Sequence, residues 1–218
     1  IERDIKLQEE IGSYVHMTHI STEGALRMLG DARRRGIRVT SDVTPHHLLL
    51  DESELRSCDP MYKMKPPLRG EKDREALVKG LADGTIDCIA TDHAPHTPEE
   101  KSRPFKEAPF GVIGMETAFP VIHDRLVRTG VIDLNRMIEV FSTNPARVMH
   151  LDKEGRGMVK PGGPADLTIV DLEKPFKIDP DDFYSKADNC PFNGWEGQGT
   201  VEYTIVNGEI VYNRETGF

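Results

Sequence analysis

Residues 88–96 read CIATDHAPH, and this stretch decides how the chain around it folds. A short apolar run ends abruptly in Asp92, His93 and, after two residues, His96. Because burying charged or titratable groups costs free energy, a buried strand that ends in such groups usually has a function for them. We therefore predict that residues 86–91 form a buried strand whose carboxyl end carries part of a functional site.

Strand and helix patterns alternate on both sides of this stretch. Short β-branched or alternating runs predict strands, and runs of helical periodicity followed by Gly36 or Gly84 predict helices. The predicted strands cover 14–20, 37–43, 61–65 and 86–91, and the predicted helices cover 25–35, 71–82, 115–129 and 134–142. This alternation predicts a parallel sheet covered by helices, with function beyond the carboxyl ends of its strands.

Each predicted strand ends in a polar side chain: His19, His46, Lys65 and Asp92, in chain order. A neutral imidazole is the commonest zinc ligand in proteins, and a carboxylate can bind metal or transfer a proton. The alternative is that these are ordinary histidines at a sheet edge and an aspartate that caps a helix. Because three strand ends carry such residues together, we favour a metal site formed by His19, His46 and Asp92.

The other nearby histidines are expected to differ in role. His16 and His47 point away from the predicted ligands, because successive strand side chains alternate between faces, so we expect them to be structural or supporting. His93 is expected to pack within its loop. The turn before His96 would fold that side chain back over the site, so we expect His96 to contact substrate.

A basic segment, KMKPPLR at residues 63–69, offers Lys63, Lys65 and Arg69. A substrate carboxylate held in a buried site needs a paired cation, and one of these side chains could supply it. The alternative is a solvated basic patch on the surface. The residues alone leave the two open.

The character of the chain changes near residue 155. Glycine-rich sequence precedes a strand-like run over 165–172, and two β runs over 201–212 surround Asn207-Gly208, a typical two-residue hairpin turn. We predict a small β module over 153–218, following an α/β part over 1–152.

Composition excludes several classes of function. The 218 residues carry a formal net charge of −9, which argues against nucleic acid and against an anionic membrane surface as partners. No apolar run approaches the roughly 18 residues of a membrane-spanning helix. The cysteines, Cys58, Cys88 and Cys190, form no disulfide framework and indicate a reducing compartment, so we expect a cytoplasmic protein.

Five segments together resemble one family. They read HMTHIST, DVTPHHLLLDE, YKMKPPLR, DGTIDCIATDHAPHTPEEK and APFGVIGMETAFP, and they are joined by PADLTIVDL and SKADNCPFNGW further along. This combination resembles the C-terminal half of bacterial dihydroorotases, which belong to the amidohydrolase superfamily. The resemblance runs through essentially the whole chain.

The resemblance implies the C-terminal half of a (β/α)8 barrel, strands five to eight, plus part of a small β-sandwich domain. It implies a binuclear zinc site in which His19 and His46 bind metal, and Asp92 binds metal and transfers the proton. It also implies that His96 and the loop of Pro109, Phe110 and Gly111 contact substrate. Lys65 stands where the family usually has an asparagine that contacts substrate.

The family's first two ligands form a His-x-His pair, and its bridging carboxylate follows strand four. This chain has no His-x-His, and it opens within a helical pattern over residues 1–11 without an initiator methionine. We interpret it as a piece of a longer protein whose strands one to four lie elsewhere. We expect the isolated piece to be inactive, to hold zinc incompletely or not at all, and to self-associate across open strand edges.

The implied reaction is the reversible interconversion of N-carbamoyl-L-aspartate and L-dihydroorotate, small-molecule substrates of pyrimidine biosynthesis. Two alternatives stay open. One is a catalytically silent subunit that supports aspartate transcarbamoylase, and the other is a dihydropyrimidinase- or allantoinase-type hydrolase. The sequence also leaves a homodimer open.

Overall fold

The computed structural model describes residues 1–218, and contacts divide them into two compact units. Unit 1 comprises residues 1–115 and 180–191, and unit 2 comprises residues 116–179 and 192–218. These units do not coincide with the predicted domains, residues 1–152 and 153–218. The predicted domain division concerns the complete protein and stays a prediction. None of the helices is long and apolar enough to cross a bilayer.

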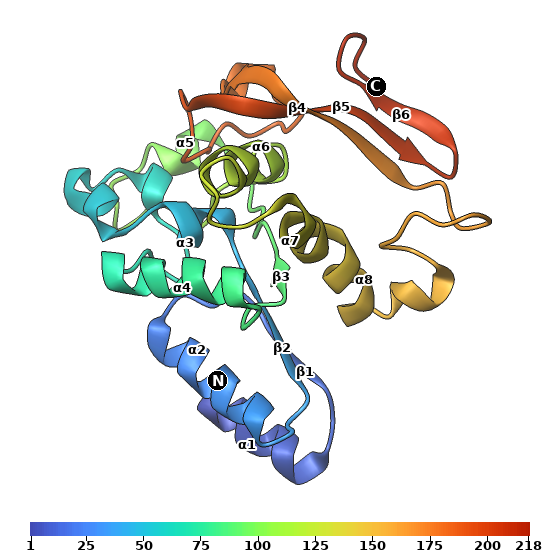
Figure 1. Cartoon of the computed structure of the whole chain (residues 1–218). Helices are drawn as coiled ribbons and strands as arrows, with labels where there is room; N and C mark the ends of the chain where they lie inside the picture. The colour runs from blue at the N-terminus through green and yellow to red at the C-terminus, as the bar shows by residue number, and fades with distance from the viewer. The chain divides into compact units, whose positions relative to one another are not determined.

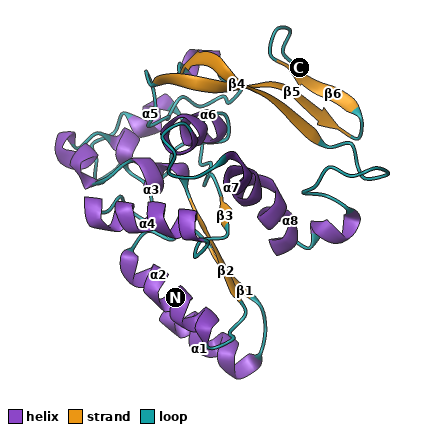
Figure 2. Cartoon of the chain, viewed as in Figure 1, coloured by secondary structure: helices purple, strands orange, loops and turns teal.

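Unit 1 alternates helices with short parallel strands (Figures 1 and 2). Its elements are α1 (Glu2–Ile11), β1 (Val15–Met17), α2 (Glu23–Arg34), β2 (Val39–Val43), α3 (Pro45–Leu49), α4 (Glu71–Asp83), β3 (Cys88–Ile89) and α5 (Pro98–Lys101). The strands pair in the order β1-β2-β3, and both pairs are parallel. The predicted α/β character and the parallel sheet are confirmed, although the strands are shorter than expected.

The helix boundaries of unit 1 follow from local chemistry. The side chain of Thr22 accepts a hydrogen bond from the amide of Ala25 and so caps the start of α2, as predicted. Gly84 ends α4 in the left-handed conformation, with φ of 88°. Helices α2 and α4 pack together, and buried Leu26 and Leu77 contribute to the core between the helices and the sheet.

The strand predicted at residues 61–65 is wrong. Asp59 caps a 3-10 turn over Pro60–Tyr62, and its side chain accepts a hydrogen bond from the amide of Met61. Proline suits the first position of such a turn, because its φ is fixed near −65° and its missing amide hydrogen is not needed there. The place beside β2 is taken by β3, so Lys65 lies in a loop and not at the end of a strand.

Unit 2 contains a helical segment and an antiparallel sheet. Its elements are α6 (Ala118–Ile122), α7 (Leu134–Ile138), α8 (Asn144–Val148), β4 (Leu167–Lys177), β5 (Glu196–Val206) and β6 (Glu209–Asn213), with π-helical turns over His123–Val127 and Glu139–Thr143. The sheet order is β4-β5-β6. The predicted hairpin is confirmed, because Asn207 and Gly208 both have positive φ between β5 and β6.

Two neighbouring side chains dock the helical segment of unit 2 onto β5. His123 donates a hydrogen bond from Nδ1 to the carbonyl of Gln198 at 2.8 Å, and Asp124 accepts one from the amide of the same residue at 3.0 Å. A Cβ at Gly199 would lie 2.3 Å from Nδ1 of His123, and φ there is +114°. Only glycine fits this approach of strand and helix.

We therefore expect Gly199→Ala in the full-length protein to lower the free energy of unfolding by about 3 kcal/mol, through overpacking and an unfavourable φ. Gly130→Ala is the matched control, because φ is +75° and no atom lies within 4 Å of the added Cβ. That variant should lose only about 1 kcal/mol. Urea denaturation measures both, and equal losses would contradict this account of the contact.

Candidate functional site

A buried carboxylate, Asp42, organises the carboxyl ends of β1 and β2. It accepts hydrogen bonds from Nε2 of His16 at 2.9 Å, from Nδ1 of His19 at 2.9 Å and from the His19 amide at 2.8 Å. Burial alone would raise the pKa of Asp42, but these hydrogen bonds outweigh burial and lower it well below its usual range. An ionised carboxylate therefore fixes both imidazole rings.

The ring of His19 is oriented with its free nitrogen outward. Because the carboxylate of Asp42 can only accept, Nδ1 of His19 carries the proton and Nε2 keeps its lone pair. That Nε2 atom lies 3.4 Å from Oδ1 of Asp92. The hydrogen bond that His19 donates to Asp42 is the main cause of the raised pKa of His19, and burial partly offsets it. The structure thus brings His19 and Asp92 together.

Both residues have unusual backbone conformations. His19 has φ of 56° and Asp92 has φ of 48°, and both lie in the left-handed region that residues with a side chain rarely adopt. Such backbone strain is often found at functional sites. Here it occurs at the two side chains that face each other beyond the strands.

His46 lies in the first turn of α3. Thr44 caps the start of this helix, because its side chain accepts a hydrogen bond from the amide of His47. Its side chain is buried, and Nε2 has no hydrogen-bond partner. Burial is the main cause that lowers the pKa of His46 well below its ordinary value, so the ring is neutral. An unpaired buried nitrogen is costly, and a neutral imidazole with a free lone pair is the form that binds a metal ion.

These residues fit a divalent metal ion. Metal-binding histidines typically donate their second nitrogen to a carboxylate, as His19 does to Asp42, and the unpaired Nε2 of His46 offers a second lone pair. The side chains do not form a complete cage, because no three His, Cys, Asp or Glu residues of the chain are grouped closely enough to hold a metal ion.

The three remaining histidines near these residues form hydrogen bonds with other protein groups. His16 bonds to Asp42 and to Thr40, and His47 bonds to the carbonyl of Pro66 at 2.9 Å. His93 accepts a hydrogen bond from the amide of Gly114 at 3.2 Å and pairs with Val112 as an isolated bridge. Each is occupied by protein partners, in keeping with the structural or supporting roles expected for them.

The predicted substrate-contacting residues lie on two linked segments. Nε2 of His96 donates to the carbonyl of Phe110 at 2.9 Å, which joins the turn after β3 to the loop that contains Pro109 and Gly111. The structure therefore brings His96 and this loop together. Lys65 is exposed in its own loop.

Lys63 is not available to pair with a substrate carboxylate. Its side chain is 7% exposed, and Nζ donates to three backbone carbonyls between residues 105 and 108. The possibility left open for Lys63 is therefore wrong. Arg69 lies near Ser21, with Nε 3.5 Å from the serine hydroxyl.

Two residues of this region were missed in the sequence. Asp42 lies one residue before the end of a β-branched run. Because burying a carboxylate in a strand costs free energy, its presence there is the one sequence feature that could have indicated a functional role. Asn189 accepts a hydrogen bond from the amide of His96, which lies 93 positions earlier, and it reaches unit 1 because the chain returns there over 180–191. No local pattern predicts that return.

Lys101 gives unit 1 a pH dependence. Burial, with the charge of Lys63 as a second cause, lowers the pKa of Lys101 from 10.5 to about 8, while Asp59 opposes the shift. Between these two values the unfolded chain binds more protons than the folded chain, so the free energy of unfolding rises with pH.

We expect the wild-type protein to gain stability relative to Lys101→Met as the pH is raised from 7.5 to 10. Lys106→Met, at an exposed position in the segment that follows α5, should follow the wild type. Urea denaturation at several pH values measures this, and parallel curves for wild type and Lys101→Met would contradict the assignment.

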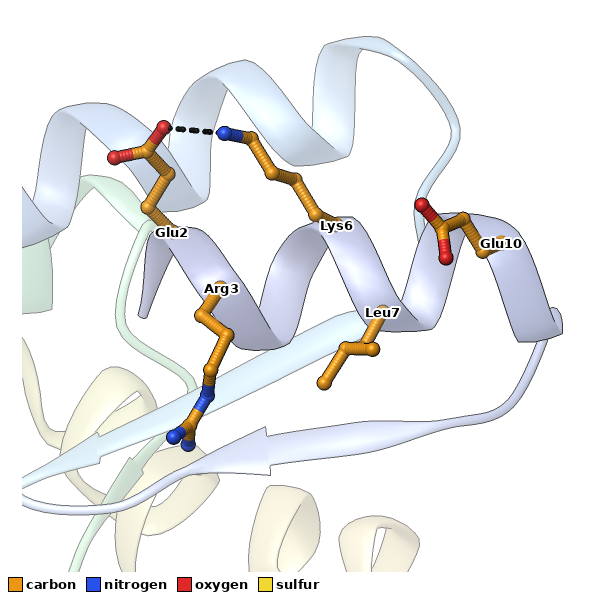
Figure 3. A pocket seen from close by; sticks show the side chains of 5 residues that line it. All are labelled: Glu2, Arg3, Lys6, Leu7 and Glu10. Carbon is orange, nitrogen blue, oxygen red and sulfur yellow. Dashed lines mark hydrogen bonds and ion pairs between the residues drawn. The ribbon is translucent and has the colours of Figure 1, made fainter.

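A hollow on the outer face of α1 lies apart from these residues. Figure 3 shows that it is lined by side chains of this one helix, among them Glu2 and Lys6, which form an ion pair at 2.8 Å. Exposed pairs of this kind contribute little to stability. The hollow brings together no group suited to catalysis.

A parallel α/β sheet with imidazoles and a carboxylate beyond its strand ends defines a class, the α/β enzymes that bind ligands at that edge. Residues 3–211 match the model of the amidohydrolase family. The chain belongs to the amidohydrolase family.

Known proteins agree with this membership. The chain is 50% identical over 216 residues to a dihydroorotase of Bacillus cytotoxicus and to one of Bacillus anthracis. Each alignment includes 99% of this chain but only 50% of the relative. Its fold is similar to the L-hydantoinase (dihydropyrimidinase) of Arthrobacter aurescens, with a TM-score of 0.94, 28% identity and coverage of 100% of this chain and 49% of that one. The dihydropyrimidinase of Brevibacillus agri gives a TM-score of 0.92 at 26% identity, covering 99% and 48%. The chain spans about half the length of these relatives.

Proposed function

We propose that this chain is one half of a zinc-dependent cyclic amide hydrolase that interconverts N-carbamoyl-L-aspartate and L-dihydroorotate. One observation carries the proposal: the pair of His19 and Asp92, with Asp42 fixing the imidazole, lies beyond strands of a chain that is 50% identical to dihydroorotases. We assign residues 1–152 to strands five to eight of a (β/α)8 barrel and residues 153–218 to the accompanying β module.

Three side chains would hold the metal. Nε2 of His19, Nε2 of His46 and the carboxylate of Asp92 are the donors, and Asp42 keeps the first imidazole in the required tautomer. A bound zinc ion would lower the pKa of water from 15.7 to about 7 and polarise the amide carbonyl. Zinc is chosen because imidazole nitrogen and carboxylate oxygen suit it.

Asp92 would move the proton. Its carboxylate accepts a proton from the attacking water and returns it to the ring nitrogen when the C–N bond of dihydroorotate breaks. In the biosynthetic direction the same carboxylate receives the proton that the carbamoyl nitrogen loses on ring closure. The side chain of Asp92 is 30% exposed, so it is accessible to substrate.

Substrate would be bound by His96 and by the loop of Pro109, Phe110 and Gly111. The bond between His96 and the Phe110 carbonyl holds these two segments as one surface. Lys65 would lie at the edge of the same site, where its exposed ammonium group can pair with a substrate carboxylate.

The remaining ligands and the bridging carboxylate would come from the half of the protein that matches the rest of the relatives. We expect the isolated chain to bind no zinc tightly, to self-associate through the open edges of β1 and β3, and to show no turnover. Metal analysis, light scattering and an activity assay of the purified chain test this. An active monomer with two tightly bound zinc ions would contradict it.

A hydantoinase-type activity is the second candidate, and the structural similarity to the Arthrobacter enzyme favours it. A third is a catalytically silent subunit that supports aspartate transcarbamoylase. The groups of His19, His46 and Asp92 argue against this third candidate, since a silent subunit has no use for an unpaired buried imidazole.

A steady-state assay of the full-length protein on dihydroorotate, hydantoin and allantoin separates these candidates. We expect the highest kcat/KM on dihydroorotate. A higher value on hydantoin or allantoin would favour the second candidate, and no turnover of any substrate by the zinc-loaded protein would favour the third.

A further inference from the structure

Two buried ammonium groups lie inside the loop over residues 104–113. The side chains of Lys63 and Lys101 belong to residues that are only 7% and 3% exposed. Nζ of Lys63 donates to the carbonyls of Phe105, Lys106 and Ala108 at 2.6, 3.1 and 2.6 Å. Nζ of Lys101 donates to the carbonyls of Pro109 and Gly111 at 3.4 and 3.0 Å. The loop thus turns five backbone carbonyls inward onto two cations.

Lys63 holds the same loop in two further ways. Its backbone carbonyl accepts from the amide of Gly111 at 2.9 Å. Its ammonium group lies 4.6 Å from the centre of the Phe110 ring, a cation–π contact. Lys63 therefore fixes the backbone and the aromatic side chain of one loop at once.

This arrangement is costly unless the loop geometry needs it. A buried ammonium group is usually paired with a carboxylate, and here every hydrogen bond from the two ammonium groups goes to a backbone carbonyl. Apolar packing could anchor a loop without such a cost. Charged donors, however, fix the direction of each carbonyl, and so fix where the backbone and side chains of the loop point.

Asn189 joins this loop to the turn that carries His96. Its amide nitrogen donates to the carbonyl of Ala94 at 3.0 Å and to the carbonyl of Gly111 at 3.1 Å. Its side-chain oxygen accepts from the amide of His96 at 3.2 Å. Asn189 itself is fully buried, and its bond to the Gly111 carbonyl is buried with it. The loop and the turn are locked together.

We propose that Lys63 and Lys101 are positioning residues: they set the conformation of the 104–113 loop, and through it the site that binds substrate beside His96. This rests on the proposed function, in which Phe110 and Gly111 contact dihydroorotate. Neither lysine touches the reacting atoms. Both act through the backbone carbonyls that they hold.

The test uses Lys101→Met in the full-length, zinc-loaded protein, with hydrogen exchange and steady-state kinetics measured on the same sample. Methionine keeps much of the side-chain volume but removes both hydrogen bonds. We expect amides of 105–113 to exchange at least ~10-fold faster, since the loop opens locally, while amides of α4 stay unchanged. We expect KM for dihydroorotate to rise at least ~10-fold with less than a threefold change in kcat, the pattern of lost substrate binding, and zinc content to stay unchanged.

Lys106→Met is the matched control, because it makes the same substitution at an exposed position of the same loop. It should match the wild type in both measurements. Lys63→Met, which leaves three carbonyls unpaired, should exceed Lys101→Met in loop exchange. If Lys63→Met fails to fold, Lys101→Met still decides the question.

Unchanged loop exchange in Lys101→Met would overturn the proposal, and so would faster exchange with an unchanged KM. A wild-type protein that does not turn over dihydroorotate would instead overturn the proposed function. In that case the exchange measurement alone would report whether the lysines hold the loop.

Discussion

Replacing Asp92 by asparagine in the full-length protein is expected to lower kcat for dihydroorotate at least ~100-fold, the lower end of what a positioned acid–base group contributes. The amide keeps the shape of the carboxylate but cannot accept and return a proton at neutral pH. Asp92 also lies in the left-handed region, which asparagine tolerates as well as aspartate does, so the fold should be retained. Steady-state kinetics, with zinc content measured on the same sample, tests this.

Asp31→Asn is the matched control. It removes a carboxylate from an exposed position on α2, where Asp31 pairs with Arg34 three residues away, and exposed pairs contribute little. Its activity should equal that of the wild type. Near wild-type turnover in Asp92→Asn would remove Asp92 from the mechanism.

The second large effect concerns His46, where we expect opposite changes in stability and metal binding. His46→Leu should abolish zinc binding at that position and with it the activity. In the metal-free protein the same change should raise the free energy of unfolding by about 1 kcal/mol, because it removes a buried nitrogen that has no partner. Urea denaturation in the presence of a chelator and metal analysis without one test the two halves.

The neighbouring histidine provides the control. His47→Leu should lower the stability of the metal-free protein by about 1–3 kcal/mol, because it leaves the carbonyl of Pro66 without its donor and removes the acceptor of the Thr44 hydroxyl proton. Its effect on zinc content should be small. If both leucine variants destabilise the metal-free protein equally, the unpaired nitrogen of His46 does not lower stability, and the expected opposition between stability and metal binding is wrong.

Several element boundaries in both units could be predicted because their signals are local. The cap at Thr22, the glycine after α4 and the turn at Asn207-Gly208 each specify a boundary through the residue's own chemistry, and the structure has all three. The strand expected at 61–65 failed for the same kind of reason. Asp59 and Pro60 favour a 3-10 turn locally, and this preference outweighs the alternating pattern of the residues that follow.

The candidate site was only partly accessible from the sequence. Strand ends indicated His19, His46 and Asp92, because polar residues after apolar runs are conspicuous. Asp42 was hidden inside a β-branched run. The roles of Lys63 and Asn189 depend on contacts with residues more than forty positions away in the chain, and no spacing rule predicts such contacts.

The buried lysines show how a sequence pattern can suggest the wrong partner. A basic segment next to a predicted site indicates an anion, and Lys63 was open to that interpretation. The structure gives its ammonium group to backbone carbonyls instead, because a loop with many unpaired carbonyls needs donors as much as an anion does. Charge alone did not distinguish these two uses.

The central claim is that His19 and His46 present Nε2 atoms to a metal ion beside Asp92. Anomalous diffraction at the zinc edge from crystals of the full-length protein tests it most directly. We predict a peak about 2.0–2.1 Å from each Nε2 atom, the usual zinc–nitrogen distance, with a carboxylate oxygen of Asp92 nearby. A zinc-loaded, active protein whose anomalous peaks lie away from both imidazoles would contradict the account.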